Sequence, residues 1–127
     1  FIYRARRNRK ALGGGMRQAG ILAAAGIVAL EKMTERIVED HQNAKALAYG
    51  ISGINGISID LEKIKTNIIY FSLDHSKIES SLFIKKMAEK NIHFFELSSS
   101  WYRLVTHRGI SKDDVRNVVE VFDQILS

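Results

Sequence analysis

The sequence predicts an α+β fold in which helices cover a small, mainly antiparallel sheet. Two long stretches with helical spacing of apolar residues lie at residues 16–49 and 111–126, near the two ends of the chain. Between them lie four short runs rich in β-branched and aromatic residues, divided into two pairs by a shorter helical segment. The order is therefore long helix, two strands, helix, two strands, helix, which is typical of an α+β unit.

The first 17 residues form a basic segment. Residues 3–12 are expected to form a short helix that ends at the three glycines 13–15, because a glycine inside a helix costs about 1 kcal/mol relative to alanine. No acidic residue precedes Glu31, and the rest of the chain carries about as many acidic as basic residues. The net charge of +5 therefore belongs to this segment, whose cations are Arg4, Arg6, Arg7, Arg9, Lys10 and Arg17.

The helix predicted over residues 16–49 changes character along its length. Its first half, AGILAAAGIVAL, carries no charge on any face, which is typical of a helix buried on all sides, and its second half is amphipathic. A sheet domain of residues 51–127 is too small to bury it, so we expect it to pack against polypeptide outside this sequence or another subunit. Together with the absence of proline and of an initiator methionine, this predicts a segment of a longer protein, with domains 1–50 and 51–127.

The strands and later helices follow from local signals. Gly50, Gly53 and Gly56 predict a loop, after which residues 57–59 and 66–73 are expected to form strands. Ser76 and Glu79 have the spacing of a capping box and predict a helix that ends near Asn91. Residues 92–97 and 101–106 are expected to form strands around a serine turn at 98–100. The last helix is expected to begin at Ser111, with Asp114 three residues on, and to bury the face made of Val115, Val118, Val119, Phe122, Ile125 and Leu126.

Composition excludes several classes of protein. The chain contains no cysteine, which removes disulfide frameworks and thiolate metal sites and favours an intracellular, cytoplasmic setting. The apolar run 19–30 is shorter than the roughly 20 residues that a membrane-spanning helix needs. The basic segment has few aromatic residues on which bases can stack, so neither a nucleic acid nor a membrane is an expected partner.

Two groups of residues are candidates for a site. A glycine-rich turn that leads into a helix, flanked by Lys10 and Arg17, is suited to an anion such as phosphate, although a plain helix break explains the same glycines. Arg103 lies in a predicted strand, where its planar fork can bind a carboxylate, or where it can be an exposed or ion-paired residue of an edge strand. The histidines lack metal-site spacing, and no serine has a neighbouring base, so this segment offers no metal ligand and no catalytic residue.

Three ordered segments resemble one enzyme family. The run ARRNRKALGGGMRQAGILAAAGIVAL is similar to the segment that follows the cofactor-binding lysine in low-specificity L-threonine aldolases, and TNIIYF at 66–71 and YRLVTH at 102–107 resemble later signatures of that family. The resemblance covers essentially the whole chain. It implies the C-terminal small α+β domain of a fold-type I enzyme that uses pyridoxal 5′-phosphate, with residues 1–50 linking to the large cofactor-binding domain.

The family resemblance also implies functions for individual residues. The enzymes cleave L-threonine or L-allo-threonine to glycine and acetaldehyde, and by similarity Arg103 binds the substrate carboxylate. Arg17 and Lys10 are expected near the cofactor phosphate in a homotetramer built as a dimer of dimers. The cofactor-binding lysine has no counterpart here, so this segment alone is expected to be inactive. The sequence departs from the family after His107, where Arg108-Gly109-Ile110 replaces the usual acidic residue.

A second interpretation remains open beside the aldolase. In it the chain is a non-catalytic binding or assembly module whose basic N-terminal helix docks on nucleic acid or an acidic partner. Steep loss of affinity with added salt would favour this interpretation, because neutralising phosphates releases counterions.

Overall fold

The computed structural model describes residues 1–127 and divides them into two units, Phe1–Arg36 and Ile37–Ser127. The division at residue 50 suggested by the sequence falls inside helix α3 (Ile37–Ser52), whose buried residues belong to the core of the second unit. The amphipathic helix that precedes the sheet is therefore part of the fold that the sheet organises.

The first unit contains two helices. The predicted basic helix is α1 (Ile2–Ala11), and the apolar helix α2 (Gly20–Val28) continues into a π-helical turn at Ala29–Met33. A continuous helix over 16–49 is wrong: α2 begins four residues late, and residues 34–36 form a turn. The Thr34 hydroxyl donates to the Leu30 carbonyl (3.2 Å), a side-chain bond of the kind that bends helices.

Helix α2 contains no buried residue within its unit. Every residue of this helix is exposed, including Ile21 and Leu22. No helix of the structure combines the length and the apolar content that crossing a bilayer requires. Helix α2 thus exposes apolar side chains to solvent, although the preceding helix α1 is strongly basic.

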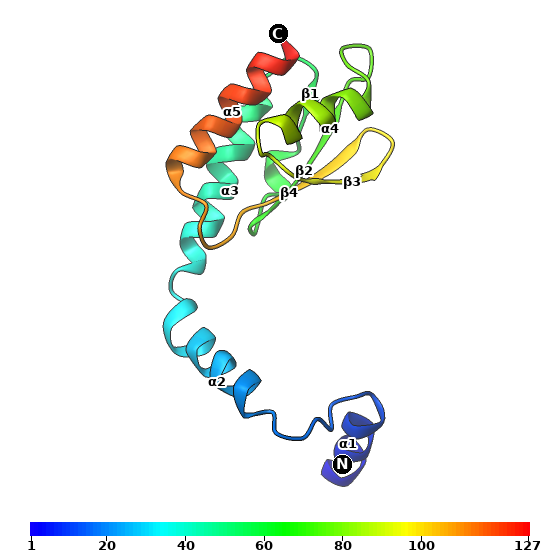
Figure 1. The fold of residues 1–127 in the computed structure, drawn as a ribbon, viewed down its shortest axis with the longest axis vertical. Coiled ribbons are helices and arrows are strands. Elements are labelled where there is room, and N and C mark those ends of the chain that lie inside the picture. The colour runs from blue at the N-terminus through cyan, green and yellow to red at the C-terminus, as the bar shows by residue number, and fades with distance from the viewer. The chain divides into compact units, whose positions relative to one another are not determined.

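The second unit is built on a four-stranded sheet of β1 (Ile57–Ser58), β2 (Ile68–Leu73), β3 (Phe95–Ser98) and β4 (Trp101–Val105). The strand order is β1-β2-β4-β3, and every neighbouring pair is antiparallel (Figure 1), which confirms the predicted α+β class. The strand expected at 92–97 begins only at Phe95. The hairpin turn between β3 and β4 contains Ser100 in a left-handed conformation (φ 74°).

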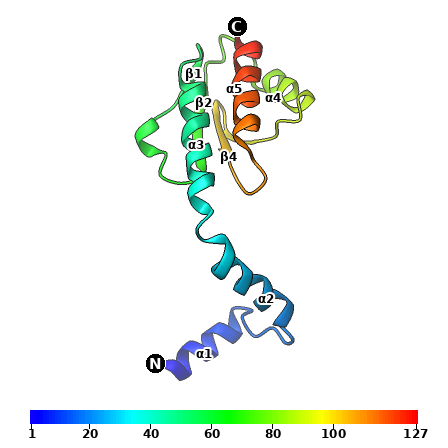
Figure 2. The same ribbon diagram turned by 90° about the vertical axis from the view of Figure 1, so that its left-hand side faces the viewer.

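Three helices cover one face of this sheet. Helices α3 and α5 (Lys112–Leu126) lie side by side in both views (Figures 1 and 2), and α4 (Ser80–Glu89) packs beside α5. The core they enclose is centred on an aromatic cluster of Phe71, Phe83, Phe94, Tyr102 and Phe122. The opposite face of the sheet carries exposed side chains, among them Tyr70 and Trp101, so the sheet is covered on one side only.

The N-terminal caps of α4 and α5 can be compared with the caps predicted from the sequence. The capping box at Ser111 and Asp114 is present, and hydrogen bonds from the Ser111 hydroxyl and N–H hold the pKa of the Asp114 carboxyl below its usual value. At α4 the predicted cap is wrong, because Glu79 caps the helix by accepting from the Ser81 N–H (3.3 Å). Ser76 instead donates its N–H to Asp74 (2.9 Å) in the preceding turn.

Gly50 also differs from its expected place in a loop. It lies inside α3, where a Cβ would stand 2.5 Å from Cγ2 of Val119 on α5, so glycine is what allows the two helices to approach. Gly53 lies beyond the end of α3, and a Cβ there meets nothing within 4 Å. The close packing of α3 on α5 thus depends on the first of these glycines.

We expect Gly50→Ala to lower the free energy of unfolding of the chain by about 1–2 kcal/mol, since the overlap with a stiff β-branched side chain outweighs the helix propensity of alanine. The measurement is urea denaturation followed by circular dichroism. Gly53→Ala is the matched control and should be close to neutral. Val119→Ala, which removes the clashing methyl groups, should make Gly50→Ala tolerated when the two are combined, and a clash elsewhere would leave the double variant no better than additive.

Candidate functional site

Arg103 lies on a central strand of the sheet. Strand β4 is paired on one side with β2 and on the other with β3, and Arg103 is opposite Tyr70 and Phe95. Successive side chains of a strand point to opposite faces, so Arg103 is on the open face while its neighbours Tyr102 and Leu104 are buried beneath the helices. The edge-strand alternative considered for this arginine is therefore excluded.

The guanidinium of Arg103 is partly covered and has an unused donor. Its Cζ lies 5.2 Å from the centroid of the Phe95 ring, and its Nε is buried without a hydrogen-bond partner. Neither surface ion pair, Lys63–Asp60 nor Arg116–Asp113, involves it. Because an unpaired buried donor costs about 1–3 kcal/mol, this cation is suited to a bound acceptor, and its planar fork matches a carboxylate.

Strand β4 is anchored on both sides of Arg103. At its C-terminal end the Thr106 hydroxyl donates to the Asp40 carbonyl of α3 (2.6 Å), and the Asn67 side chain donates to the Thr106 carbonyl (2.7 Å). At the other side the Tyr102 hydroxyl donates to Ser80 of α4 (2.7 Å), and burial raises the pKa of this phenol. A site on a strand fixed in this way has a defined geometry.

Sequence reasoning did not single out these anchors. The alternation of a strand places Tyr102 and Thr106 on the same buried face as Leu104. Because a buried polar group needs a hydrogen-bond partner, this pattern could have identified both residues as anchors. The partners themselves come from segments 22 and 66 residues away in the chain, which no local pattern identifies.

The glycine-rich turn differs from the anion-binding loop that the sequence suggested. The N–H of Gly13 donates to the Lys10 carbonyl (3.3 Å) and that of Gly14 to the Arg9 carbonyl (2.8 Å), with Gly13 at φ +89°. These amides close the C-terminus of α1, the negative end of its dipole, and α2 begins only at Gly20. The turn therefore offers no N-terminal helix dipole to an anion.

Lys10 and Arg17 still provide positive charge around this turn. Both side chains are exposed, and Lys10 lines a shallow hollow on α1 with Tyr3, Arg6, Arg7, Arg9 and Ala11, whereas Arg17 does not. A phosphate fits these residues through side-chain cations rather than backbone amides. Both residues belong to the first unit and Arg103 to the second.

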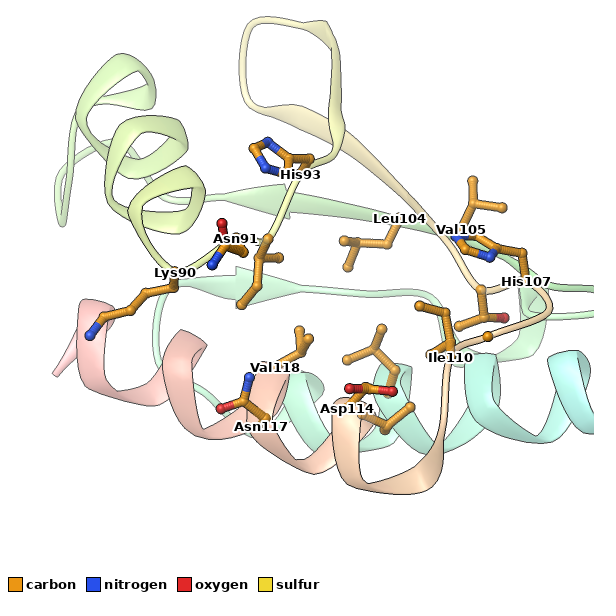
Figure 3. A pocket seen from close by; sticks show the side chains of 15 residues that line it. Lys90, Asn91, His93, Leu104, Val105, His107, Ile110, Asp114, Asn117 and Val118 are labelled. Carbon is orange, nitrogen blue, oxygen red and sulfur yellow. The ribbon is translucent and has the colours of Figure 1, made fainter.

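A separate pocket of about 590 Å³ lies on the helix-covered side of the sheet. Figure 3 shows its apolar walls, with Leu104 of β4 facing Val118 of α5, and His93 and His107 at well-separated positions. The Asp114 carboxylate at its edge is already engaged by the Ser111 cap. The pocket therefore brings together neither a metal-ligand pair nor an acid and a base, and Arg103 remains the residue with the strongest case for ligand binding.

The remaining polar candidates have structural roles. His107 is in a loop, as expected, and its Nδ1 lies 2.8 Å from the carbonyl oxygen of the next residue. Ser99 and Ser100 form the predicted turn of the β3–β4 hairpin. Ser98 is the last residue of β3, and it pairs with Trp101 across the hairpin.

Comparison with known proteins identifies relatives along nearly the whole chain. The family model of β-eliminating lyases matches residues 1–74. Low-specificity L-threonine aldolase 1 of Arabidopsis thaliana is 36% identical over 127 residues, which is 99% of this chain and 36% of the relative. The low specificity L-threonine aldolase of Escherichia coli K12 is 36% identical over 118 residues, covering 93% of this chain and 33% of that protein. The chain thus spans about a third of the length of these relatives.

A solved structure shares the fold. The cystine C-S lyase C-DES, in complex with its reaction product cysteine persulfide, superposes with a TM-score of 0.65 at 15% identity, over 83% of this chain and 28% of that one. At this identity the likeness establishes the architecture. The predicted α+β architecture is thereby confirmed.

Proposed function

Because the chain belongs to the β-eliminating lyase family, we propose that it forms the C-terminal part of an aldolase that cleaves L-threonine or L-allo-threonine to glycine and acetaldehyde with pyridoxal 5′-phosphate. The identity of 36% to a threonine aldolase over 127 residues supports this reaction. The observation that carries the proposal is Arg103, a partly covered cation with an unpaired donor on a strand anchored at both ends.

In the proposed enzyme Arg103 binds the carboxylate of the amino-acid substrate. A carboxylate accepts two parallel hydrogen bonds from a guanidinium, which fixes both the position and the rotation of the substrate. Anchoring of β4 by Thr106 and Tyr102 keeps that fork in place. Because the carboxylate is attached to Cα, holding it also positions the neighbouring Cα–Cβ bond.

Lys10 and Arg17 are assigned to the phosphate of the cofactor in the same proposal. Bound pyridoxal phosphate supplies the electron sink that the cleavage of the Cα–Cβ bond requires. The two side-chain cations hold the phosphate, since the amides of Gly13 and Gly14 are used within the turn. No residue of this chain is assigned to proton transfer, and the cofactor-binding lysine belongs to another part of the complete protein.

The proposed assembly is a cytoplasmic dimer of dimers. The exposed apolar side chains of α2 support an interior or interface position for this helix in the complete subunit. Lys10 and Arg17 then serve either their own active site or that of a neighbouring subunit. The absence of cysteine is compatible with a reducing compartment.

The test is an activity assay of the complete protein that contains this chain. We expect acetaldehyde and glycine to form in equal amounts from L-threonine or L-allo-threonine, with activity lost on removing pyridoxal phosphate and restored on adding it. A protein that binds the cofactor but releases no acetaldehyde would contradict the aldolase assignment.

The alternative is a binding or assembly module, and its supporting observation is that every residue of the basic helix α1 is exposed. The same purified protein would then lack cofactor-dependent activity and bind polyanions with an affinity that falls steeply with salt.

A further inference from the structure

Phe95 is opposite Arg103 in the antiparallel pairing of β3 with β4. Both side chains are on the open face of the sheet, and the ring of Phe95 lies beside the guanidinium, with 5.2 Å between the ring centroid and Cζ. Directly opposite residues are the closest cross-strand neighbours in a sheet, so this contact is built into the register. An aromatic face attracts a cation at this distance and limits the rotation of the planar group.

Phe95 lies largely in solvent on the open face of the sheet. Its side chain is 65% exposed, so the ring contributes little to stability through burial of apolar surface. The contact that Phe95 does make is the one with Arg103, which points to a role in the properties of that cation.

Strand β3 is an edge strand, and a second set of contacts fixes it. Glu96 is on the opposite face from Phe95 and accepts a hydrogen bond from the Ser80 hydroxyl at the start of α4 (2.8 Å). Ser80 in turn accepts from the buried Tyr102 hydroxyl (2.7 Å). This chain of hydrogen bonds ties β3 and β4 to the same helix, so the ring of Phe95 is held in register with the guanidinium.

We propose that Phe95 is a positioning residue for Arg103, whose ring orients the guanidinium to receive the substrate carboxylate. The inference rests on the proposed function, since it presumes that Arg103 binds that carboxylate. The planar guanidinium presents its fork to the carboxylate, and the ring restricts the plane in which that fork lies. The arginine side chain then loses less conformational freedom when the carboxylate binds, which strengthens binding.

The test uses the complete enzyme with Phe95→Leu, which removes the ring and keeps an apolar side chain. We expect the KM for L-threonine to rise about three- to tenfold with kcat within about twofold, the pattern of lost substrate binding. Phe95→Tyr keeps the aromatic face and should retain the original KM. Leu97→Ala, which truncates another exposed apolar side chain of β3, is the matched control and should leave both constants unchanged.

A double-mutant cycle separates positioning from a structural effect. In an Arg103→Ala background, Phe95→Leu should have no further effect on KM, because the ring acts through the guanidinium. An undiminished effect in that background, or an unchanged KM for Phe95→Leu in the original enzyme, would overturn the inference about Phe95. If Arg103→Ala itself leaves KM unchanged, the assignment of Arg103 fails instead, and the two failures are thereby distinguished.

Discussion

Replacing Arg103 with alanine in the complete enzyme is expected to raise the KM for L-threonine about a hundredfold. Each hydrogen bond to a charged group contributes about 1.5–3 kcal/mol, so the loss of two such bonds at the lower limit is about 3 kcal/mol. At about 1.4 kcal/mol per tenfold, this corresponds to two orders of magnitude in binding. The kcat should change less, since the lost contact binds the ground state and the transition state alike.

Three comparisons make the Arg103 result specific. Arg103→Lys keeps the charge but not the planar fork, so we expect an intermediate KM. Arg116→Ala removes another arginine of the same unit, one that is paired with Asp113 on the surface, and should leave the KM unchanged. Titration with pyridoxal phosphate should give the same cofactor affinity for Arg103→Ala as for the original enzyme, and a KM that does not move would remove this residue from the substrate site.

The sequence names single candidate residues for the site but does not predict their arrangement. The sequence pattern predicts that Arg103 lies in a strand, and the guanidinium of any arginine can bind a carboxylate. Its position on a central strand depends on the order β2-β4-β3, which pairing between distant segments sets. The same pairing creates the contact with Phe95. For the glycine turn the sequence suggested an anion-binding loop, because a glycine-rich turn precedes a helix. In the structure the amides of Gly13 and Gly14 instead donate to carbonyls at the end of the preceding helix.

The fold was predictable wherever one local signal dominated. Helix α5 combines a capping box with a regular apolar face, and both are present, although Val121 is buried as well. Where two signals competed the prediction was wrong: Ser76 and Glu79 can each start a helix, and the Asp74 turn decides in favour of the second. The break after α2 lies beside a hydrogen bond from the Thr34 hydroxyl to the Leu30 carbonyl, which the spacing of apolar residues does not predict.

The buried aromatic cluster is expected to dominate the stability of the second unit. Phe71 of β2 is its centre: the residue is fully buried, its ring stacks on Tyr102 at 5.1 Å and 22°, and it meets Phe83 and Phe122 edge to face. It joins the sheet to both α4 and α5. Removing this ring leaves a cavity bordered by several rigid rings, which cannot collapse to fill it.

We therefore expect Phe71→Ala to lower the free energy of unfolding by about 3–5 kcal/mol, a large part of the roughly 5–15 kcal/mol typical of a domain. Urea denaturation monitored by near-ultraviolet circular dichroism measures this loss and reports the aromatic packing directly. Tyr70→Ala, at the neighbouring position of the same strand but on the open face, should cost less than about 1 kcal/mol. Equal losses for the two variants would mean that both faces of the sheet are equally covered, contrary to the one-sided packing described above.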